Sequence, residues 1–284
     1  MKMKMFSPIL LLLTRSICFL GIIGFMHLSV QAQRTHVFGV GTGTVYYYGE
    51  LTDEFNSSAL KPTVTAFYQR YLSFAQRVSY KLAFTTGEIA ATDATANDPG
   101  REVRNLHFKN RLYEGSAVVV IEALPDKNFG LDQFAGPHLT PYVFGGIAMF
   151  KHNPKARYQG EWYDLQPLGT EGQFLEANKG PYSLLQISFP TGVGFNLRLA
   201  QYAGVNVELG YRLTMTDYLD DISTVYPNLA ELAERNGPLA AELSERSPEG
   251  IFEQGNIRGN PNTNDGYFFA NFSITYYLSR FANR

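Results

Sequence analysis

Several segments of this chain place apolar and polar residues at alternate positions, and this pattern strongly limits the fold. The clearest is the segment 205–216, where Val, Leu, Tyr and Met alternate with Asn, Glu, Gly, Arg and Thr. Segment 267–278, near the C-terminus, repeats it with Phe, Ala, Ile, Tyr and Leu in one phase. A period of two predicts a β-strand with one apolar and one polar face. The chain is therefore predicted to be all-β.

Six further segments complete a set of eight predicted strands. They are residues 37–51, 60–69, 74–86, 106–123, 141–151 and 186–199. The connections between successive strands run long, short, long, intermediate, long, short and very long. An up-and-down membrane barrel has short periplasmic turns and long outer loops. A soluble sandwich, the alternative for any single strand of this kind, does not sort its loops to one end in this way.

The apolar phases indicate that the barrel lies in lipid. After residue 33 no apolar run approaches the roughly 18 residues of a membrane helix. A tilted strand of about 9–11 residues crosses a bilayer, and a closed barrel satisfies every backbone group there. The predicted fold is an eight-stranded antiparallel up-and-down transmembrane β-barrel of the outer membrane. It has long outer loops and a short helical insert in the last loop.

The N-terminus has the pattern of an export signal. Lys2 and Lys4 precede a largely apolar stretch that ends in a small-residue cleavage pattern. We expect residues 1–32 to be a cleaved signal peptide and residues 33–284 to form the barrel. Arg15 interrupts the apolar stretch, which leaves a signal anchor as the alternative.

Cysteine usage and charge exclude two classes of function. Cys18 is the only cysteine and lies within the predicted signal, so we expect neither disulfides nor thiol catalysis in the mature chain. The net charge of −2 contains no basic excess. Proteins that bind nucleic acid neutralise phosphates with Lys and Arg, so nucleic acid is not an expected partner.

Charged residues gather on the polar phases of the predicted strands. The interior of an eight-stranded barrel is narrow enough for side chains to fill, and an isolated buried charge is costly. We therefore expect these charges to pair and to form a polar plug, with a gated conduit for a small solute as the alternative. The predicted lumen ion-pair network consists of Arg77, Lys81, Glu114, Glu122, Arg198, Glu208 and Arg212.

Three acidic residues, Asp217, Asp220 and Asp221, follow the seventh predicted strand at the outer rim. Calcium binds such carboxylates, but the segment lacks a full ligand set at the spacing of a calcium loop. We predict no metal site and no cofactor. The rim is expected to be solvated or to form hydrogen bonds with the neighbouring loop.

Catalysis is not expected either. An outer-membrane hydrolase needs a His with a Ser or Asp near one membrane interface. His107 and His152 lie at the outer ends of the fourth and fifth predicted strands, but no nucleophile motif accompanies them. We predict that the chain is not an enzyme and has no catalytic residues.

The long loops carry two features with open interpretations. Residues 228–246 have helical periodicity, which Gly237 and Pro238 divide into two short helices. Their apolar stripe either binds a partner or packs on its own loop, the usual arrangement. Trp162, with two neighbouring tyrosines, could bind sugar or lie at the lipid interface.

A set of short motifs, taken in order, resembles one family. The motifs are residues 48–51 (Tyr-Gly-Glu-Leu), 104–108 (Arg-Asn-Leu-His-Phe), 112–114 with Glu122, 140–146 (Thr-Pro-Tyr-Val-Phe-Gly-Gly), 210–212 and 216–221 (Thr-Asp-Tyr-Leu-Asp-Asp). Their order and spacing resemble those of the PorG-like outer-membrane barrel proteins of the type IX secretion and gliding motility apparatus. The resemblance covers residues 37–278. The helical insert of the last loop has no place in the family pattern.

The resemblance implies a role in protein secretion without catalysis. Such proteins are thought to link a periplasmic ring, built of a lipoprotein and its partner subunit, to the outer membrane. The alternatives are a barrel whose outer loops bind a surface ligand or partner, a small-solute channel, and a lipid-modifying enzyme. Binding to the ring is expected at the periplasmic turns, through Arg70, Tyr71, Leu72, Gln201 and Tyr202.

Overall fold

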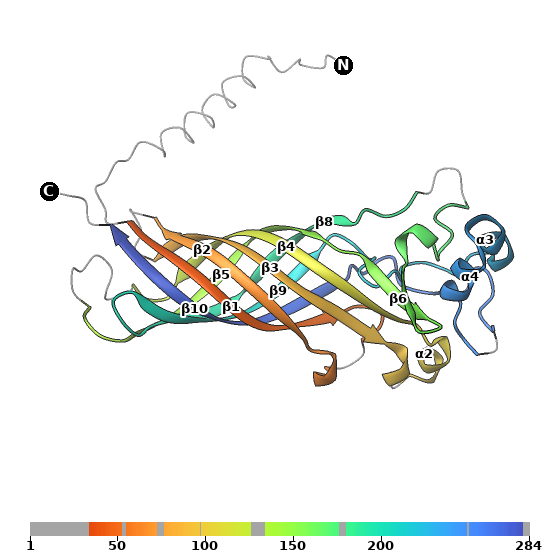
Figure 1. Cartoon of the computed structure of the whole chain (residues 1–284), viewed down its shortest axis with the longest axis horizontal. Coiled ribbons are helices and arrows are strands. Elements are labelled where there is room, and N and C mark those ends of the chain that lie inside the picture. The colour runs from red at the N-terminus through yellow and green to blue at the C-terminus, as the bar shows by residue number, and fades with distance from the viewer. Residues whose placement is uncertain are drawn as a thin grey trace, which may run out of the picture.

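Eight long antiparallel strands form a closed barrel (Figure 1). A computed structural model describes residues 34–52, 55–72, 77–96, 98–125, 134–175, 180–248 and 250–280. The barrel strands are β1 (Arg34–Tyr48), β2 (Lys61–Tyr71), β3 (Val78–Thr92), β4 (His107–Glu122), β5 (His138–Lys151), β8 (Leu185–Arg198), β9 (Ala203–Thr214) and β10 (Gly266–Arg280). Strand β1 closes on β10 along its whole length, from Arg34 opposite Arg280 to Tyr48 opposite Gly266. The predicted fold class is confirmed.

Smaller elements gather at the end of the barrel where the long connections lie (Figure 1). Among the described residues, no helix is long and apolar enough to cross a membrane. The two short helices expected in the last loop are present, divided at Gly237 as the sequence predicts. The elements are η1 (Ser57–Ala59), η2 (Asp93–Thr95), α2 (Pro99–Arg104), the hairpin β6 (Pro154–Tyr158) and β7 (Glu161–Asp164), η3 (Gln166–Leu168), α3 (Leu229–Asn236) and α4 (Pro238–Ser244).

The structure corrects several predicted boundaries. Residues 88–92, predicted as part of a loop, extend β3 and pair with the outer end of β4. The polar and small residues of this stretch hid the strand, although Ile89 is fully buried in the barrel. Strand β1 ends at Tyr48 rather than residue 51, and β5 begins three residues earlier than predicted.

The loop predicted over residues 153–181 also contains regular structure. The β6–β7 hairpin forms within it, and β6 adds to β4 by pairing Lys155 with Lys109. Three sequence predictions lie outside the described residues. They are the signal peptide, the start of the third predicted strand at residue 74 and residues 126–133 of the return at 124–139.

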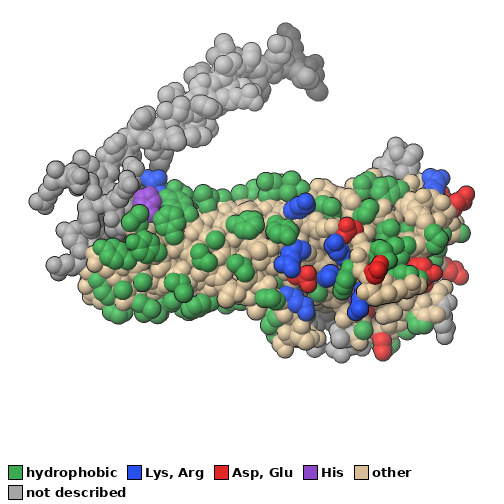
Figure 2. All heavy atoms as spheres, in the orientation of Figure 1, with side chains coloured by type: hydrophobic (Ala, Val, Ile, Leu, Met, Phe, Trp, Pro, Cys, Tyr) green, Lys and Arg blue, Asp and Glu red, His purple; other side chains and the backbone are tan. Residues whose placement is uncertain are grey.

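The outer surface of the barrel is an apolar belt. Along each strand, exposed large hydrophobic side chains alternate with buried side chains, many of them polar, that face the lumen. On the face shown in Figure 2, hydrophobic side chains run along the barrel, while Lys, Arg, Asp and Glu gather near the end with the helices. Such a belt is stable only in lipid, because water would penalise it. The chain is an outer-membrane β-barrel, with its short turns at the periplasmic end. Belt residues include Val40, Val64, Phe84, Val119, Ile147, Phe195, Leu213 and Ile274.

The interior is built in layers along the barrel axis. Near the periplasmic end Phe67 packs with Val37 and Tyr277. Its ring occupies the space where a side chain at Gly39 would project, which explains the glycine there. The middle of the lumen is polar. Toward the outer end a cluster of twelve buried hydrophobic residues, among them Tyr47 and Phe150, joins the strands to the outer loops.

Candidate functional site

Two ion pairs fill the middle of the lumen. The Lys81 ammonium pairs with the Glu208 carboxylate, which also accepts a hydrogen bond from the Tyr142 hydroxyl at 2.9 Å. One layer further out, Arg212 Nη2 lies 3.0 Å from Glu114 Oε1. All four charges come from inward positions of β3, β4 and β9, as the polar phases of these strands require.

Hydrogen bonds and aromatic rings provide further contacts to the charged groups of these two ion pairs. Tyr267 donates its hydroxyl to Glu114 Oε2 at 2.7 Å, and the same oxygen accepts a hydrogen bond from Arg212 Nε at 3.2 Å. The Lys81 ammonium also faces the rings of Phe67 and Phe144, with its nitrogen 5.3 and 5.2 Å from their centroids. Each charge in the middle of the lumen therefore has an opposite charge and further polar or π-face contacts, the arrangement that buried charges need.

The other three charged residues of the predicted network form different contacts. Glu122 accepts hydrogen bonds from the hydroxyl of Tyr71 and from Asn196. Arg198 lies over the ring of Tyr277 and donates to a carbonyl of the β8–β9 turn. Arg77 is exposed and does not enter the lumen.

Arg77 instead binds the end of β4. Its guanidinium donates to the backbone carbonyls of Glu122 and Ala123, at 3.0 and 2.6 Å. Its place in the predicted network was wrong because the residue stands in the turn before β3, where strand alternation has not begun.

Little space is left inside the barrel. The cavity between the two ion pairs has a volume of only about 20 Å³, which is close to the minimum for one water molecule. A continuous path through the described lumen would require several side chains to move together. The geometry thus favours the plug over the conduit.

The residues predicted to contact a partner at the periplasmic end differ in accessibility. Tyr202 is 49% exposed and stacks on Tyr276, with ring centroids 6.3 Å apart. Arg70, Leu72 and Gln201 are half-buried. Tyr71 does not fit the prediction, because it is the last residue of β2 and points inward.

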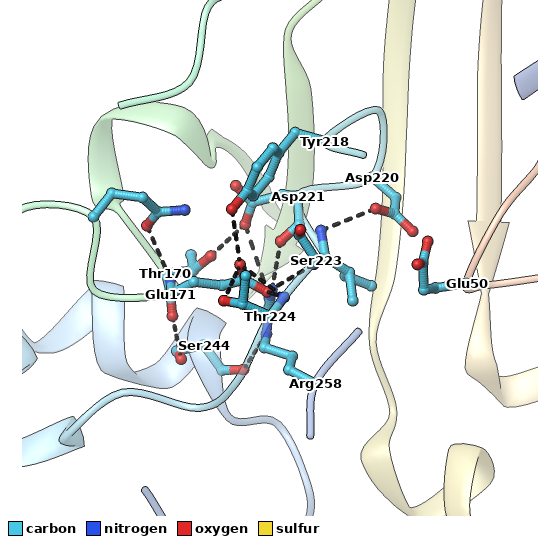
Figure 3. Close-up of polar contacts among 12 residues, drawn as sticks. Glu50, Thr170, Glu171, Tyr218, Asp220, Asp221, Ser223, Thr224, Ser244 and Arg258 are labelled. Carbon is cyan, nitrogen blue, oxygen red and sulfur yellow. Dashed lines mark hydrogen bonds and ion pairs between the residues drawn. The ribbon is translucent and has the colours of Figure 1, made fainter. Parts of the chain in front are cut away.

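The β3–β4, β5–β8 and β9–β10 connections form a folded cap over the outer mouth of the barrel. Glu171 lies at the centre of the polar contacts in this cap (Figure 3). Glu171 belongs to the β5–β8 connection. It accepts hydrogen bonds from the backbone nitrogens of Ser223 and Thr224, at 2.8 and 3.0 Å, in the β9–β10 connection. Its partner of opposite charge is Arg258, at 3.0 Å. One buried acid therefore fastens two outer loops to each other.

Arg258 extends this network to a third element. Its Nε donates to the carbonyl of Ser244 at the end of α4, and Nη1 donates to the carbonyl of Asp221. Asp221 adopts the left-handed φ of 70°, which is uncommon for a residue with a side chain. The hydroxyls of Thr170 and Tyr182 hold its carboxylate. Burial raises the pKa of Asp221 to about 6, although the Arg258 charge acts in the opposite direction.

A second ion pair connects the β3–β4 connection to the same cap. Asp93 binds Arg104 through two contacts, at 2.8 and 2.9 Å, and binds Arg101 at 3.0 Å. Arg104 in turn donates to the carbonyl of Arg258 at 2.7 Å. The outer loops thus form one bonded structure rather than separate arms.

Below the cap, the predicted acidic rim is buried rather than solvated. Asp217, Asp220 and Asp265 are at most 7% exposed, and Glu50 lies beside them. Burial raises the pKa of Asp217 to about 8, and the nearby charge of Glu50 acts in the same direction. Burial also raises the pKa values of Asp220 and Asp265 well above their usual range. The predicted hydrogen bonds to a neighbouring loop do occur, at Asp221 through Thr170.

Sequence reasoning missed Glu171, Arg258 and Asp265. Loop residues have no periodicity from which burial could be predicted, and their partners come from connections far apart in the chain. The motif residues 48–51 and 216–221 offered the only signal, because both meet at this rim in the structure.

Comparison with known proteins gives a family. The profile of the family described as "Domain of unknown function (DUF6089)" matches residues 15–237. The chain belongs to this family. No curated protein matches this DUF6089 chain.

Solved structures similar to this DUF6089 barrel are small outer-membrane barrels. The N-terminal β-barrel domain of OprF from Pseudomonas aeruginosa is 10% identical, with a TM-score of 0.37, over 87% of this chain and 98% of that chain. The attachment invasion locus protein Ail of Yersinia pestis, in complex with the heparin analogue sucrose octasulfate, is 8% identical, with a TM-score of 0.41. That match covers 87% of this chain and 99% of that chain. The fold of this barrel is established by its own strand register.

The two histidines of the outer end lie in structural positions in this DUF6089 barrel. His152 is buried between Asn110 and the carbonyl of Ser183, and burial lowers its pKa to about 4. His107 accepts a hydrogen bond from the backbone nitrogen of Arg157. Among the described residues, neither ring forms a hydrogen bond with a Ser or Thr hydroxyl.

A groove of about 690 Å³ lies beside the cap. It is bounded by the β1–β2 connection, the η2–α2 segment and the β6–β7 hairpin. Its lining mixes aromatic rings with cationic side chains, a composition that suits anionic or sugar-like ligands. The aromatic and basic residues of the lining are Tyr46, Phe55, Phe108 and Trp162 with Lys61, Arg101 and Arg157.

Proposed function

We propose that this protein is a non-conducting outer-membrane scaffold that anchors the periplasmic ring of a type IX secretion apparatus. The observation that carries the proposal is the lumen filled by its own ion pairs, Lys81 with Glu208 and Arg212 with Glu114. A barrel without a path through it acts through its surfaces, and its short periplasmic end is the surface that a periplasmic ring can reach.

The ordered motifs that resemble PorG-like proteins support the choice of partner. The expected partners are the ring lipoprotein and its partner subunit. At the periplasmic end Tyr202 and Leu199, 49% and 50% exposed in the β8–β9 turn, offer an aromatic and an aliphatic contact, and the half-buried Leu72 lies just after β2 at the same end. Aromatic side chains of this kind are frequent anchors in protein interfaces.

The partner is tested by co-purification from native membranes in mild detergent. The tagged protein is expected to retain the ring lipoprotein and its partner subunit. Tyr202→Glu combined with Leu72→Asp, at the periplasmic end, should release both. Trp162→Ala, at the opposite end, is the matched control and should retain them. Absence of the ring subunits from the wild-type preparation, together with normal type IX export after deletion of the gene, would rule out the anchoring role.

Absence of conduction is tested separately in planar bilayers. The reconstituted protein is expected to show no steady ion conductance. A regular single-channel conductance in the wild-type protein would contradict the plugged lumen and would favour the small-solute channel instead.

The groove beside the cap favours a second candidate function, binding of a surface ligand by the outer loops. Its cationic and aromatic lining suits an anionic glycan. Binding of a sulfated polysaccharide to the detergent-solubilised protein would be measured, with Trp162→Ala and Arg157→Ala as variants. Equal binding by both variants and the wild type would exclude the groove.

A further inference from the structure

Three carboxylates from two connections, β1–β2 and β9–β10, converge under the cap. Glu50, Asp220 and Asp265 each offer one oxygen, and these oxygens all lie within 4.8 Å of one another. Figure 3 shows the side chains of Asp220 and Glu50 pointing toward each other from two loops. Oxygens on opposite sides of a Ca²⁺ ion are about 4.6–5.2 Å apart, because each Ca–O distance is about 2.3–2.6 Å. One ion can therefore contact all three.

The two aspartates are held in place for such contacts. The Tyr47 hydroxyl lies 2.6 Å from Asp220 Oδ2 and 2.8 Å from Asp265 Oδ1. Backbone nitrogens of Ile222 and Leu219 bind the other oxygen of each carboxylate, at 2.9 and 2.8 Å. A carboxylate oxygen accepts more than one contact, so every oxygen retains a lone pair for a cation.

Asp217 gives an independent sign that a ligand belongs here. Asp217 is 7% exposed, and no donor among the described residues forms a well-directed hydrogen bond with either carboxylate oxygen, although the side chains of Ser223 and Glu50 lie close enough to shift its pKa. It lies beside Glu50, whose Oε2 also has no partner in that part of the chain. Buried polar atoms are rarely left unbonded unless an ion or water meets them.

The basic residues of the cap do not neutralise this cluster. Arg104 directs its guanidinium to Asp93, and Arg258 directs its own to Glu171. In the described ranges, no Lys or Arg side chain forms an ion pair with any of the four acids, Glu50, Asp217, Asp220 and Asp265. Three buried carboxylates and the half-buried Glu50 without an ion-pair partner are costly, and either protons or a bound cation can offset their charge.

We propose that Glu50, Asp220 and Asp265, with Asp217 beside them, bind one Ca²⁺ ion at the outer rim of the barrel. The donors are all carboxylate oxygens, which favour hard divalent cations over zinc or copper. Irregular loop geometry favours Ca²⁺ over Mg²⁺, which demands a near-ideal octahedron. The ion joins the β1–β2 and β9–β10 connections and so fixes the base of the cap. The site is independent of the proposed function at the periplasmic end.

The test uses Tb³⁺ as a luminescent substitute for Ca²⁺ on the detergent-solubilised full chain. Tyr47 touches two of the ligands, so excitation of tyrosine should sensitise a Tb³⁺ ion bound there. The wild-type protein is expected to give a luminescence signal that saturates at one Tb³⁺ per chain and is displaced by Ca²⁺.

Variants separate ligand loss from loosening of the cap. Asp220→Asn and Asp265→Asn should each weaken Tb³⁺ and Ca²⁺ binding by about tenfold or more, because each removes a charged ligand. Asp221→Asn is the matched control: the residue is adjacent and equally buried but bonds to Thr170 and Tyr182. It should retain the saturable signal.

Three results would overturn the proposal. They are a wild-type protein without a saturable signal, unchanged binding in Asp220→Asn and Asp265→Asn, and equal loss in Asp221→Asn. The first would mean that the carboxylates share protons instead of a cation. The last would mean that the signal follows the fold of the cap rather than these ligands.

Discussion

The lumen and the outer rim bury comparable numbers of acids but neutralise them differently. In the lumen, Glu114 and Glu208 face Arg212 and Lys81 across the barrel, so the chain supplies both signs of charge. At the rim, Glu50, Asp217, Asp220 and Asp265 are all acids, and no described basic side chain forms an ion pair with them. The difference shows that the middle of the lumen is electrostatically complete as folded, whereas the rim depends on what the solution supplies.

Breaking the lumen pairs should have the largest effect. Arg212→Met leaves Glu114 buried without its counter-charge, and removing one partner of a buried pair costs about 3–5 kcal/mol. We expect the urea midpoint of the refolded protein in detergent to fall accordingly. Adding Glu114→Gln to the same chain should restore part of the loss, since the stranded charge is then gone. If the losses of stability from the two substitutions simply add in the double variant, Arg212 and Glu114 do not act as an ion pair.

Without a bound metal ion, the stability of the folded protein should depend on pH through the rim carboxylates. Unfolded carboxyls titrate near pH 4, whereas the folded Asp217 titrates at about 8. Between these values the folded state binds more protons than the unfolded state, so stability falls as pH rises and levels off above about pH 8. The charged groups that act on Asp217 are Glu50, Asp220 and, from the cap, Glu171, while the Ser223 side chain stabilises its ionised form.

This pH dependence is measured as the apparent melting temperature in EDTA from pH 5 to pH 9. It should decline with pH in the wild-type protein and flatten in the double variant Asp217→Asn/Asp220→Asn. Saturating Ca²⁺ should also flatten it, because a bound cation holds the carboxylates ionised. A rise with pH in EDTA would contradict the buried, unneutralised rim.

A smaller effect is expected from Gly49, which lies between the barrel and the rim. A Cβ at this position would collide with the Asp265 carboxylate and the Tyr47 hydroxyl. Gly49→Ala should therefore weaken Ca²⁺ binding and lower the stability of the barrel by about 1–3 kcal/mol, the usual cost of overpacking. Calorimetric titration of Ca²⁺ checks the first effect and urea unfolding the second. Unchanged affinity would place the ion elsewhere.

The contrast between the lumen, which is built from strands, and the rim, which is built from loops, also explains which features the sequence could predict. Strand positions have a period of two, so the inward placement of Lys81, Glu114, Glu208 and Arg212 followed from alternation alone. Where alternation stops, prediction failed: Arg77 stands in a turn and binds backbone carbonyls instead of a lumen acid.

The cap could not be predicted in this way. Its bonds join Asp93, Glu171 and Arg258, which come from three different connections. No local pattern predicts which loop residues meet, and a buried acid in a loop looks like a solvated one in the sequence. The sequence drew attention to Asp217, Asp220 and Asp221 at the rim, but Glu50 and Asp265 were absent from the set because only folding brings them together.

The most direct test compares one acid from each region. Glu114→Gln and Asp217→Asn are melted side by side in EDTA at pH 9, which lies above the pKa of about 8 of Asp217. Opposite signs are expected: Glu114→Gln lowers the melting temperature because it leaves Arg212 without its counter-charge, and Asp217→Asn raises it because it removes an unneutralised buried charge. Shifts of the same sign would contradict the distinction between a self-neutralised lumen and a rim that needs an ion.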